Sequence, residues 1–299
     1  MSILNLQRFV RSEESAARTL YRYRYGGGVG ARGPLPVARC PRCVTARAYR
    51  LGDGRWRCSV CRYTFGLLTE TWLEACRLPP ATWLWVIKLF ELELVAQQAG
   101  VQLGLSYPTI LRAFTTIRRA LLAAAEPTLF QAEVEADESY FGPRRPARSR
   151  GHPRNQGRST PHKIPVFGIL ERHGRVQVTV VRDCSAESLL RATLRTVKRG
   201  SLVYTDRWQG YDTLTFCGYR HLQVDHGKRF SRPSPSGKVH INGLEGFWSY
   251  AKGKLRKHHG VSPQKFPLYL YEAQFRYNHR HQDLFDLLLK LLVQPVPDL

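Results

Sequence analysis

The spacing of apolar residues divides the chain into a helical first part and a later part in which strands and helices alternate. Apolar positions recur at helical intervals in residues 3–25 and 81–125. Shorter apolar runs, typical of strands, follow at 131–141, 163–172, 175–183 and 201–206. A helical run, 186–197, separates the last two of them. The pattern therefore predicts an α/β domain after a helical region.

Residues 240–260 carry a further amphipathic helix. Its apolar stripe, which we expect to pack on a core, is formed by Leu244, Phe247, Trp248, Ala251 and Leu255. A second face of the same helix carries Glu245, Ser249, Lys252 and Arg256. This helix is therefore expected to present one carboxylate and two cations away from the core.

Two aspartates further upstream give this carboxylate a chemical context. Asp137, in VEADESYFG, and Asp206, in SLVYTDRWQGY, each lie at the expected end of a strand. Three carboxylates on separate core elements indicate a site for a metal ion. An alternative for Glu245 is a capping box, in which Asn242 is the N-cap and Glu245 lies three residues later.

The charge of the chain points to a polyanionic partner. Lys and Arg number 46 against 23 Asp and Glu, which gives a formal charge of +23 and a pI near 10.2. Such a surface attracts nucleic acid before any specific contact is made. A membrane partner is disfavoured, because there is no lipidation motif and the apolar run 83–95 contains charged residues. Arg8 and Arg11 interrupt the N-terminal segment, which argues against a secretory signal.

Four of the seven cysteines have the spacing of a metal site. Two Cys-x-x-Cys pairs, Cys40 with Cys43 and Cys58 with Cys61, flank a turn-containing segment. This pattern predicts a zinc ribbon, in which four thiolates hold one structural Zn²⁺ and leave no open position for catalysis. Disulfides or unrelated buried thiols are the alternatives.

The pattern of 81–125 breaks at 97–110 in the manner of a helix-turn-helix. Gly100 and Gly104 lie near the expected turn, Ser106 can cap the second helix, and Pro108 fits its first turn. Candidate DNA contacts on that helix are Arg112, Arg118 and Arg119. Two helices that act only as a structural spacer would give the same pattern.

Two basic, turn-rich segments are further candidates for contacting phosphates. Residues 142–163 hold seven Lys or Arg, four Pro and no acidic residue. Residues 226–238 are similar in character. The cations proposed to contact DNA in these two segments are Arg144, Arg145, Arg148, Arg150, Lys228 and Arg229.

The ordered motifs resemble a known family. A zinc ribbon, a helix-turn-helix, VEADESYFG, VYTDRWQGYDTL, HINGLEGFWSYAK and YLYEAQFRYNHR together resemble the zinc-ribbon insertion-sequence transposases of the DDE, RNase-H-like superfamily. By this resemblance Asp137, Asp206 and Glu245 match the catalytic acids, and Lys252 matches a basic position on the same helix. Asn242 is an alternative third ligand, because some relatives use asparagine there. Glu135 shares strand parity with Asp137 and is a second alternative.

The resemblance implies a fold, a set of domains and an activity. We expect an N-terminal helix and linker (1–34), a zinc ribbon (35–68), a helix-turn-helix-like region (69–127) and an RNase-H-like domain with a mixed sheet flanked by helices (128–299). The expected activity is cleavage of insertion-sequence ends and joining of their 3′-hydroxyls to target DNA with Mg²⁺ or Mn²⁺, by a homo-oligomer located in a prokaryotic cytoplasm at the nucleoid. Lys252 and Arg256 would contact phosphates. A catalytically silent DNA-binding regulator and an RNase-H-like nuclease are the competing classes.

Overall fold

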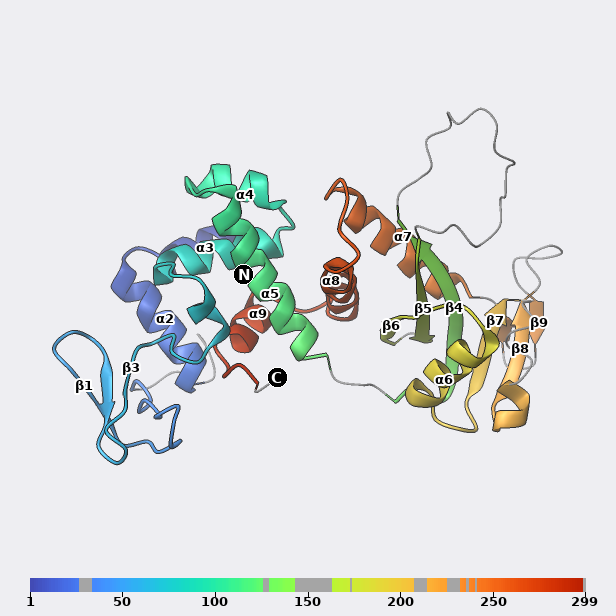
Figure 1. Cartoon of the computed structure of the whole chain (residues 1–299), viewed down its shortest axis with the longest axis horizontal. Coiled ribbons are helices and arrows are strands. Elements are labelled where there is room, and N and C mark those ends of the chain that lie inside the picture. The colour runs from blue at the N-terminus through green and yellow to red at the C-terminus, as the bar shows by residue number, and fades with distance from the viewer. Residues whose placement is uncertain are drawn as a thin grey trace. The chain divides into compact units, whose positions relative to one another are not determined.

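The structure is a computed structural model, and it describes residues 1–26, 34–125, 129–142, 163–172, 174–206, 214–224, 232–234, 237–239 and 241–297. The chain forms two compact units (Figure 1). The first unit contains Met1–Ala125 and His279–Leu299, and the second contains Glu126–Asn278. The sequence had placed residues 279–299 with the catalytic domain. They join the first unit because the apolar face of their helix packs against helices of that unit.

The N-terminal unit begins with two helices, α1 (Ile3–Phe9) and α2 (Glu13–Gly26). The sequence pattern predicted helix over 3–25 with Ser12 as an N-cap, and this cap is confirmed. Ser12 Oγ accepts a hydrogen bond from the Ser15 backbone N–H at 3.1 Å, so a new helix begins there and the run is divided in two. Glu13 and Glu14 then lie in the first turn of α2, where negative side chains interact favourably with the helix dipole.

A small three-stranded antiparallel sheet follows. It consists of β1 (Ala48–Arg50), β2 (Trp56–Cys58) and β3 (Thr64–Phe65), in the order β1-β2-β3. The buried cluster around this sheet includes Cys40, Cys58 and Phe65. Trp56 stacks between Tyr21 of α2 and Phe65, with ring centroids 5.5 Å and 6.3 Å away. Aromatic packing therefore joins the ribbon to α2.

The remaining helices of this unit pack around one another. They are the 3-10 turn η1 (Trp72–Ala75), α3 (Pro80–Glu91), α4 (Ala96–Leu103), α5 (Tyr107–Ala123) and α9 (Leu284–Leu292). The predicted break between α4 and α5 is present: Gly104 has φ of 63° and ends α4, and Ser106 Oγ accepts from the Thr109 N–H and caps α5. A Cβ on Gly100 would lie 2.7 Å from the Leu105 carbonyl oxygen, so only glycine allows this tight turn.

The C-terminal unit contains a five-stranded sheet in the order β6-β5-β4-β7-β8. The strands are β4 (Glu133–Phe141), β5 (Ile164–Glu171), β6 (Val176–Val180), β7 (Leu202–Asp206) and β8 (Arg220–Val224). The pairs β4–β5 and β5–β6 are antiparallel, whereas β4–β7 and β7–β8 are parallel. This mixed sheet has the RNase-H-like arrangement that the resemblance implied. Strand β8 was not predicted, because its segment RHLQV has only moderate apolar content.

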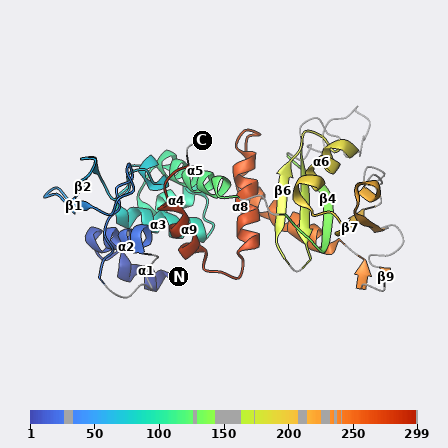
Figure 2. The ribbon, with the colours of Figure 1, turned by 90° about the horizontal axis from the view of Figure 1, so that it is seen from below.

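Helices cover the two faces of this sheet (Figure 2). Alternate residues of β4 and β5, such as Val134 and Phe167, pack with Leu189 of α6 (Ala186–Thr196). The intervening residues, such as Val166, pack with α7 (Asn242–Arg256) and α8 (Phe266–Asn278). Asp137 therefore belongs to the α7 side by strand parity.

Two shorter features complete this unit. A separate hairpin is formed by β9 (Arg232–Ser234) and β10 (Gly237–Val239), and it overlaps the end of the segment 226–238 that the sequence analysis interpreted as a basic loop. At the outer edge of β6, Gln274 and Asn278 of α8 accept hydrogen bonds from the Val178 and Val176 N–H groups, both at 2.8 Å. These amides occupy the edge that another strand could otherwise pair with.

Within the described part of the chain, every helix is too short or too polar to cross a membrane.

Candidate functional site

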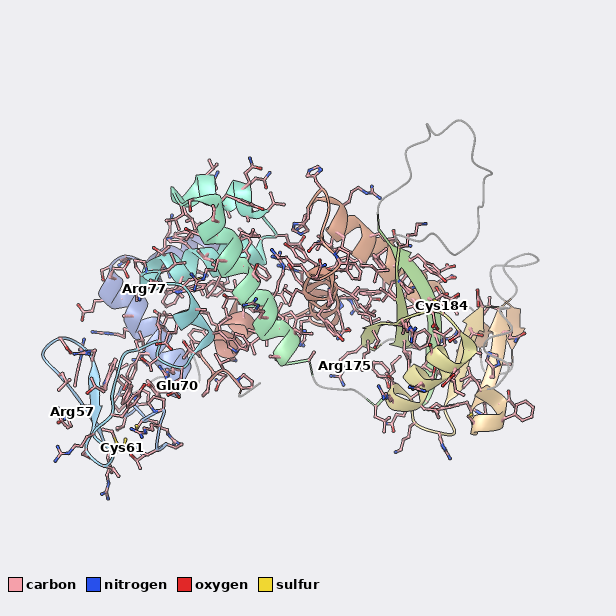
Figure 3. All side chains as sticks on the ribbon, in the orientation of Figure 1. Arg57, Cys61, Glu70, Arg77, Arg175 and Cys184 are labelled. Atoms are coloured by element: carbon pink, nitrogen blue, oxygen red, sulfur yellow. The ribbon has the colours of Figure 1, made fainter. Side chains whose placement is uncertain are left out.

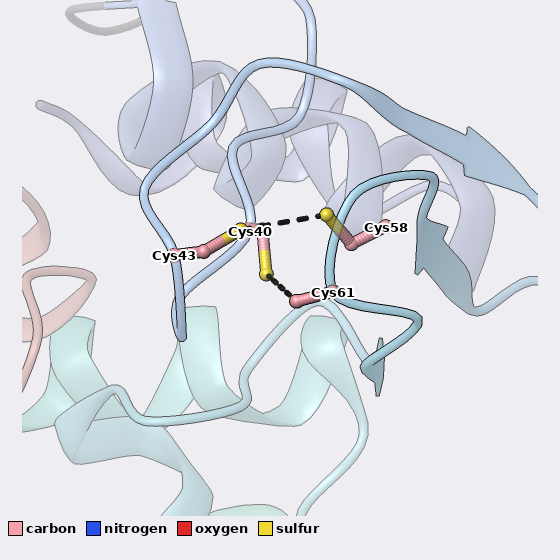
Figure 4. A group of neighbouring side chains, drawn as sticks. All are labelled: Cys40, Cys43, Cys58 and Cys61. Atoms are coloured by element: carbon pink, nitrogen blue, oxygen red, sulfur yellow. Dashed lines mark hydrogen bonds between the residues drawn. The ribbon is translucent and has the colours of Figure 1, made fainter.

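The four predicted zinc ligands lie together in the ribbon. The sulfurs of Cys40, Cys43, Cys58 and Cys61 all lie within 4.8 Å of one another (Figure 4). Cys40 faces Cys61 and Cys43 faces Cys58, each pair with sulfurs 3.5 Å apart. These separations exclude disulfide bonds, whose sulfurs lie about 2 Å apart. The predicted set of four thiols is therefore confirmed, and the disulfide alternative is wrong.

The donor set suits Zn²⁺. Backbone N–H groups, first that of Cys61, donate toward the Cys58 sulfur and, with the Thr45 hydroxyl, lower the pKa of Cys58 to about 6. Although the Tyr63 N–H opposes the rise, burial and the neighbouring thiols instead raise the pKa of Cys61. A thiolate is the form that binds metal, and four of them complete a tetrahedral shell. A closed shell of this kind stabilises a fold and offers no position for a substrate.

Two of the three predicted acids come from neighbouring parallel strands. Asp206 ends β7, and β4 pairs with β7 through Glu135 opposite Tyr204. Continuing this register by two residues places Asp137 opposite Asp206. The sequence placed Asp137 at a strand end, but it lies in the middle of β4, because β4 continues to pair with β5 as far as Phe141.

The electrostatics of Asp137 reflect this placement. Burial raises the pKa of Asp137 to about 7, and the nearby charges of Glu138 and Asp206 act in the same direction. The indole Nε1 of Trp248 donates a hydrogen bond to Asp137 Oδ2 at 3.0 Å and opposes the rise. A bound cation would relieve the repulsion between these neighbouring carboxylates.

Helix α7 carries the third predicted acid as the sequence analysis expected. Leu244, Phe247 and Ala251 are fully buried, whereas Glu245 and Lys252 are exposed on another face. Burial raises the pKa of Glu135 on β4, and the charge of Glu245 adds to the rise. Among the described residues, however, the cysteines form the one group of three or more potential ligands within 4.8 Å, so the three carboxylates are not gathered that closely.

The capping-box alternative for Glu245 is not formed. The N-cap position of α7 is Ile241, and no side chain at that position makes a capping hydrogen bond. The Leu244 N–H donates instead to Glu135 Oε2, at 2.8 Å. Since β4 supplies the acceptor for this helix end, Glu245 is not needed as a cap.

Lys252 lies close to the first acid. Its pKa is lowered by burial of its stem, and the charge of Asp137 acts in the opposite direction. Its ammonium lies over the Phe141 ring, 5.6 Å from the centroid. Lys252 therefore brings a cation into the electrostatic range of Asp137.

The arginines of the helix-turn-helix do not share one environment. Arg112 and Arg119 are exposed on α5, as the sequence analysis expected of DNA contacts. Arg118 is a correction: it is 3% exposed and packs over the rings of Phe90 and Phe114, at 5.3 Å and 6.0 Å. It faces the core because it lies one turn after the buried Phe114 on the same face of the helix.

The ribbon adds basic side chains of its own. Arg57 projects from β2, and Cys61 marks the metal set nearby (Figure 3). Other predicted DNA contacts fall outside the described residues, namely Arg144, Arg145, Arg148, Arg150, Lys228 and Arg229. Most of the basic segment 142–163 lies outside them as well.

Sequence reasoning missed two residues that touch this site. Trp248 was interpreted as part of the apolar stripe, yet it also donates to Asp137. Arg172 was not singled out, yet it forms ion pairs with Glu133 and Glu135. A tryptophan three residues after the acid on the helix could have signalled the first contact, but no local pattern signals the second.

Comparisons with known proteins agree with this architecture. Residues 130–278 match the model of the ISXO2-like transposase domain, and residues 11–64 match that of the transposase zinc-ribbon domain. An uncharacterised protein in the transposable element ISH50 of Halobacterium salinarum is 31% identical over 280 residues, which cover 89% of this chain and 90% of that protein. An uncharacterised transposase-like protein of Haemophilus influenzae is 32% identical over 120 residues, 40% of this chain and 94% of its own length.

Solved structures add a more distant likeness. The Mos1 strand transfer complex shares 14% identity with a TM-score of 0.23, over 62% of this chain and 71% of that chain. A pre-cleavage Mos1 transpososome gives 13% identity and a TM-score of 0.21. These scores are too low to carry an argument. The two matched family models and the near full-length relative do carry one, and this chain belongs to the zinc-ribbon, ISXO2-like family of insertion-sequence transposases, with a DDE-type domain.

Proposed function

We propose that this transposase binds the ends of its insertion sequence, hydrolyses a phosphodiester bond there and joins the freed 3′-hydroxyl to target DNA. Asp137, Asp206 and Glu245 are the proposed catalytic ligands of Mg²⁺ or Mn²⁺. One observation carries the proposal: Asp137 and Asp206 lie on adjacent parallel strands, close enough for the charge of one to raise the pKa of the other. Family membership supports the same activity.

The chemistry of the donors fits a hard divalent cation. Carboxylate oxygens are the ligands that Mg²⁺ and Mn²⁺ prefer. When bound, two such ions stabilise the attacking and leaving oxygens of an in-line displacement. Asp137, between Asp206 and the helix that carries Glu245, is the proposed bridging ligand.

The remaining groups of the site orient the acids and the substrate. Trp248 donates a hydrogen bond to Asp137 Oδ2 and so orients this carboxylate. Lys252, and beside it Arg256, would bind non-bridging phosphate oxygens through charge-assisted hydrogen bonds. No side chain needs to form a covalent bond with DNA, because water and then the 3′-hydroxyl are the nucleophiles.

Recognition of DNA is assigned to the N-terminal unit. The exposed first turns of α5 present Tyr107 and Arg112, in the position from which a recognition helix contacts a major groove. Exposed arginines of the ribbon, such as Arg57, would add contacts with phosphates. The proposed partners are DNA and, in the complex that joins two ends, further copies of this chain.

The test is a joining assay with labelled element ends and a target plasmid. Asp137→Asn, Asp206→Asn and Glu245→Gln should each keep zinc content, thermal stability and DNA affinity, and lose joining by orders of magnitude, because a neutral amide is a poor ligand for Mg²⁺. Asn242→Ala should keep joining. Activity in Glu245→Gln with loss in Asn242→Ala would move the third ligand to Asn242.

The same assay separates the competing classes. Wild-type protein that cleaves ends without joining them would be a nuclease, and protein that only binds them would be a regulator. Either result would contradict the proposal.

A further inference from the structure

A buried carboxylate that is not one of the three proposed acids connects the elements that carry them. Glu135 lies on β4, two residues before Asp137, and is 1% exposed. Its Oε2 accepts a hydrogen bond from the backbone N–H of Leu244, the residue before Glu245, at 2.8 Å. The first turn of α7 is therefore held by a side chain from the strand of Asp137.

This contact gives a hydrogen-bond partner both to the start of the helix and to the buried carboxylate. The first N–H groups of a helix have no partner inside it, and α7 lacks a capping side chain of its own. A buried carboxylate is costly unless it is paired and hydrogen-bonded. Burial raises the pKa of Glu135, whereas the N–H groups of Leu244 and Gly243 and the charge of Arg172 act against the rise. The helix end and Arg172 thus supply a partner for each oxygen of this buried carboxylate.

Arg172 extends the contact to the strand of the second acid. Its Nε lies 3.7 Å from Glu135 Oε1, and its guanidinium lies over the ring of Tyr204, 3.7 Å from the centroid. Tyr204 is buried on β7, two residues before Asp206, and its hydroxyl donates to Glu133 at 3.0 Å. Each proposed acid therefore has a member of this network one or two residues before it in the chain.

A second contact makes the alignment of α7 on β4 specific. Trp248 donates to Asp137, four residues along the helix and two along the strand from the first contact. Four helical residues rise about 6 Å and two strand residues about 6.6 Å, so the two contacts have nearly the same spacing on both elements. Slippage of α7 by one turn would break both.

Glycines permit this close packing. A Cβ on Gly243 would lie 2.5 Å from Leu170 Cδ2 and 3.0 Å from Glu135 Oε2. A Cβ on Gly168, which pairs with Asp137, would lie 2.6 Å from the Trp248 ring. By contrast, nothing lies within 4 Å of a Cβ built on Gly246.

We propose that Glu135 is a positioning residue of the transposase: it fixes the start of α7 against β4, and thereby sets where Glu245 lies relative to Asp137 and Asp206. The proposal rests on the function proposed for those three acids. It also replaces the earlier alternative of Glu135 as a metal ligand, because both of its oxygens face protein partners in a buried setting.

The experiment compares Glu135→Ala and Glu135→Gln with wild type in the full chain. Hydrogen exchange is measured at the amides of residues 243–248, and joining and DNA affinity are measured as Mg²⁺ is titrated. Glu135→Ala should speed exchange in this turn by about tenfold, the effect of losing a capping bond. Joining should fall by about tenfold or more with a raised Mg²⁺ requirement, while DNA affinity stays at the wild-type value, because misplacement of catalytic groups by about 1 Å is costly.

The conservative variant and two glycine variants sharpen the test. Glu135→Gln keeps an oxygen acceptor but loses the charge beside Arg172, so it should fall between wild type and Glu135→Ala; it also carries the test if Glu135→Ala does not fold. Gly243→Ala should loosen the same turn, since its methyl would meet Leu170 and Glu135. Gly246→Ala is the matched control: its methyl meets nothing within 4 Å and alanine favours a helix, so exchange at 243–245 should be no faster than in wild type.

The results that would overturn the proposal are distinct from failure of the proposed function. Exchange and Mg²⁺ requirement at the wild-type level in both Glu135 variants would overturn it. So would exchange that rises throughout the C-terminal unit with unchanged joining per folded molecule, since that describes general stability only. Asp137→Asn is assayed alongside: if it still joins DNA, the proposed function fails, whereas an inactive Asp137→Asn beside a fully active Glu135→Ala refutes the positioning role alone.

Discussion

In the N-terminal unit four cysteines within one short segment supply a metal site, whereas in the C-terminal unit the three proposed acids come from β4, β7 and α7. Cys40 and Cys61 are 21 positions apart, and all four sulfurs lie within 4.8 Å. Trp248 and Asp137, which tie the acid-bearing elements together, are 111 positions apart. One site is local and closed, whereas the proposed acid site is assembled by the fold from distant segments.

The difference indicates what each site is suited to do. Four thiolates fill the coordination shell of zinc, so the ribbon site can only stabilise its own module. Carboxylates that are spread over three elements leave positions for water and phosphate oxygens. Changes in the first site should therefore appear as loss of folding and binding, and changes in the second as loss of chemistry.

The largest expected effect is loss of the ribbon. Cys58→Ser removes one of four ligands from a site whose metal contributes on the order of 10 kcal/mol to folding of such modules. Bound zinc should fall from about one equivalent to near zero, with loss of specific end binding, while the C-terminal unit stays folded. Metal analysis and circular dichroism measure this. Cys217→Ser, in the other unit, is the control and should keep the zinc; a full equivalent in Cys58→Ser would refute the assignment.

Without added Mg²⁺, Asp137 should make the free energy of unfolding depend on pH. The pKa of Asp137 is raised to about 7 from an ordinary value near 4. Between these values the folded state holds a proton that the unfolded state releases, so the free energy of unfolding falls as pH rises. The fall should be on the order of 2–4 kcal/mol between pH 4 and pH 7, and Asp137→Asn should remove most of it.

Asp183 provides a control of the opposite sign for this experiment. Hydrogen bonds from Ser185 and Ser188 lower the pKa of Asp183 to about 2. Its contribution is lost only as the pH falls from about 4 toward 2, so Asp183→Asn should leave the slope above pH 5 unchanged. An equal slope in wild type and Asp137→Asn would contradict the proposed electrostatics.

Lys252, in the C-terminal unit, should affect the joining reaction more than the affinity for DNA. Lys252→Ala removes a charge-assisted phosphate contact worth about 1.5–3 kcal/mol, so joining should fall roughly ten- to a hundredfold. Thermal stability should change little, and Lys252→Arg should restore part of the joining. Lys265→Ala, an exposed cation beyond α7, is the matched control. Unchanged joining in Lys252→Ala would make it an ordinary surface residue.

Arg112, in the N-terminal unit, should affect DNA binding more than joining, and its effect should be the smallest of the series. Arg112→Ala should weaken DNA binding severalfold and reduce the log–log salt slope by about 1, with joining per bound end unchanged. Arg118→Ala should instead lower thermal stability, since it removes the cation over Phe90 and Phe114. Binding titrations at several salt concentrations distinguish the two, and equal effects of both would contradict the assignment of Arg112 to DNA.

The sequence predicted most of what depends on local spacing. The cysteine pairs, the Ser106 cap, the apolar stripe of α7 and the first four strands of the sheet are all present as expected. Each of these features depends on residues close together in the chain, so periodicity or ligand spacing is enough to predict it.

The features that the sequence could not predict depend on contacts between distant segments. The capping of α7 by Glu135 joins residues 109 positions apart, so the nearby Asn242 looked like the natural N-cap. Arg118 had the composition of a DNA contact, but its burial depends on α3, which supplies Phe90. The position of α9 in the N-terminal unit likewise follows from the partner of an apolar face, which periodicity does not identify.

The most direct test of the proposed acid site is a change of metal preference at Asp137. Mn²⁺ accepts a thiolate ligand more readily than Mg²⁺ does. Asp137→Cys is therefore predicted to be inactive in joining with Mg²⁺ and to recover joining with Mn²⁺, while Asp137→Asn stays inactive with both. Joining by Asp137→Cys that is equally absent with both ions would fail to support a metal contact, and full joining by Asp137→Asn with Mg²⁺ would contradict the account.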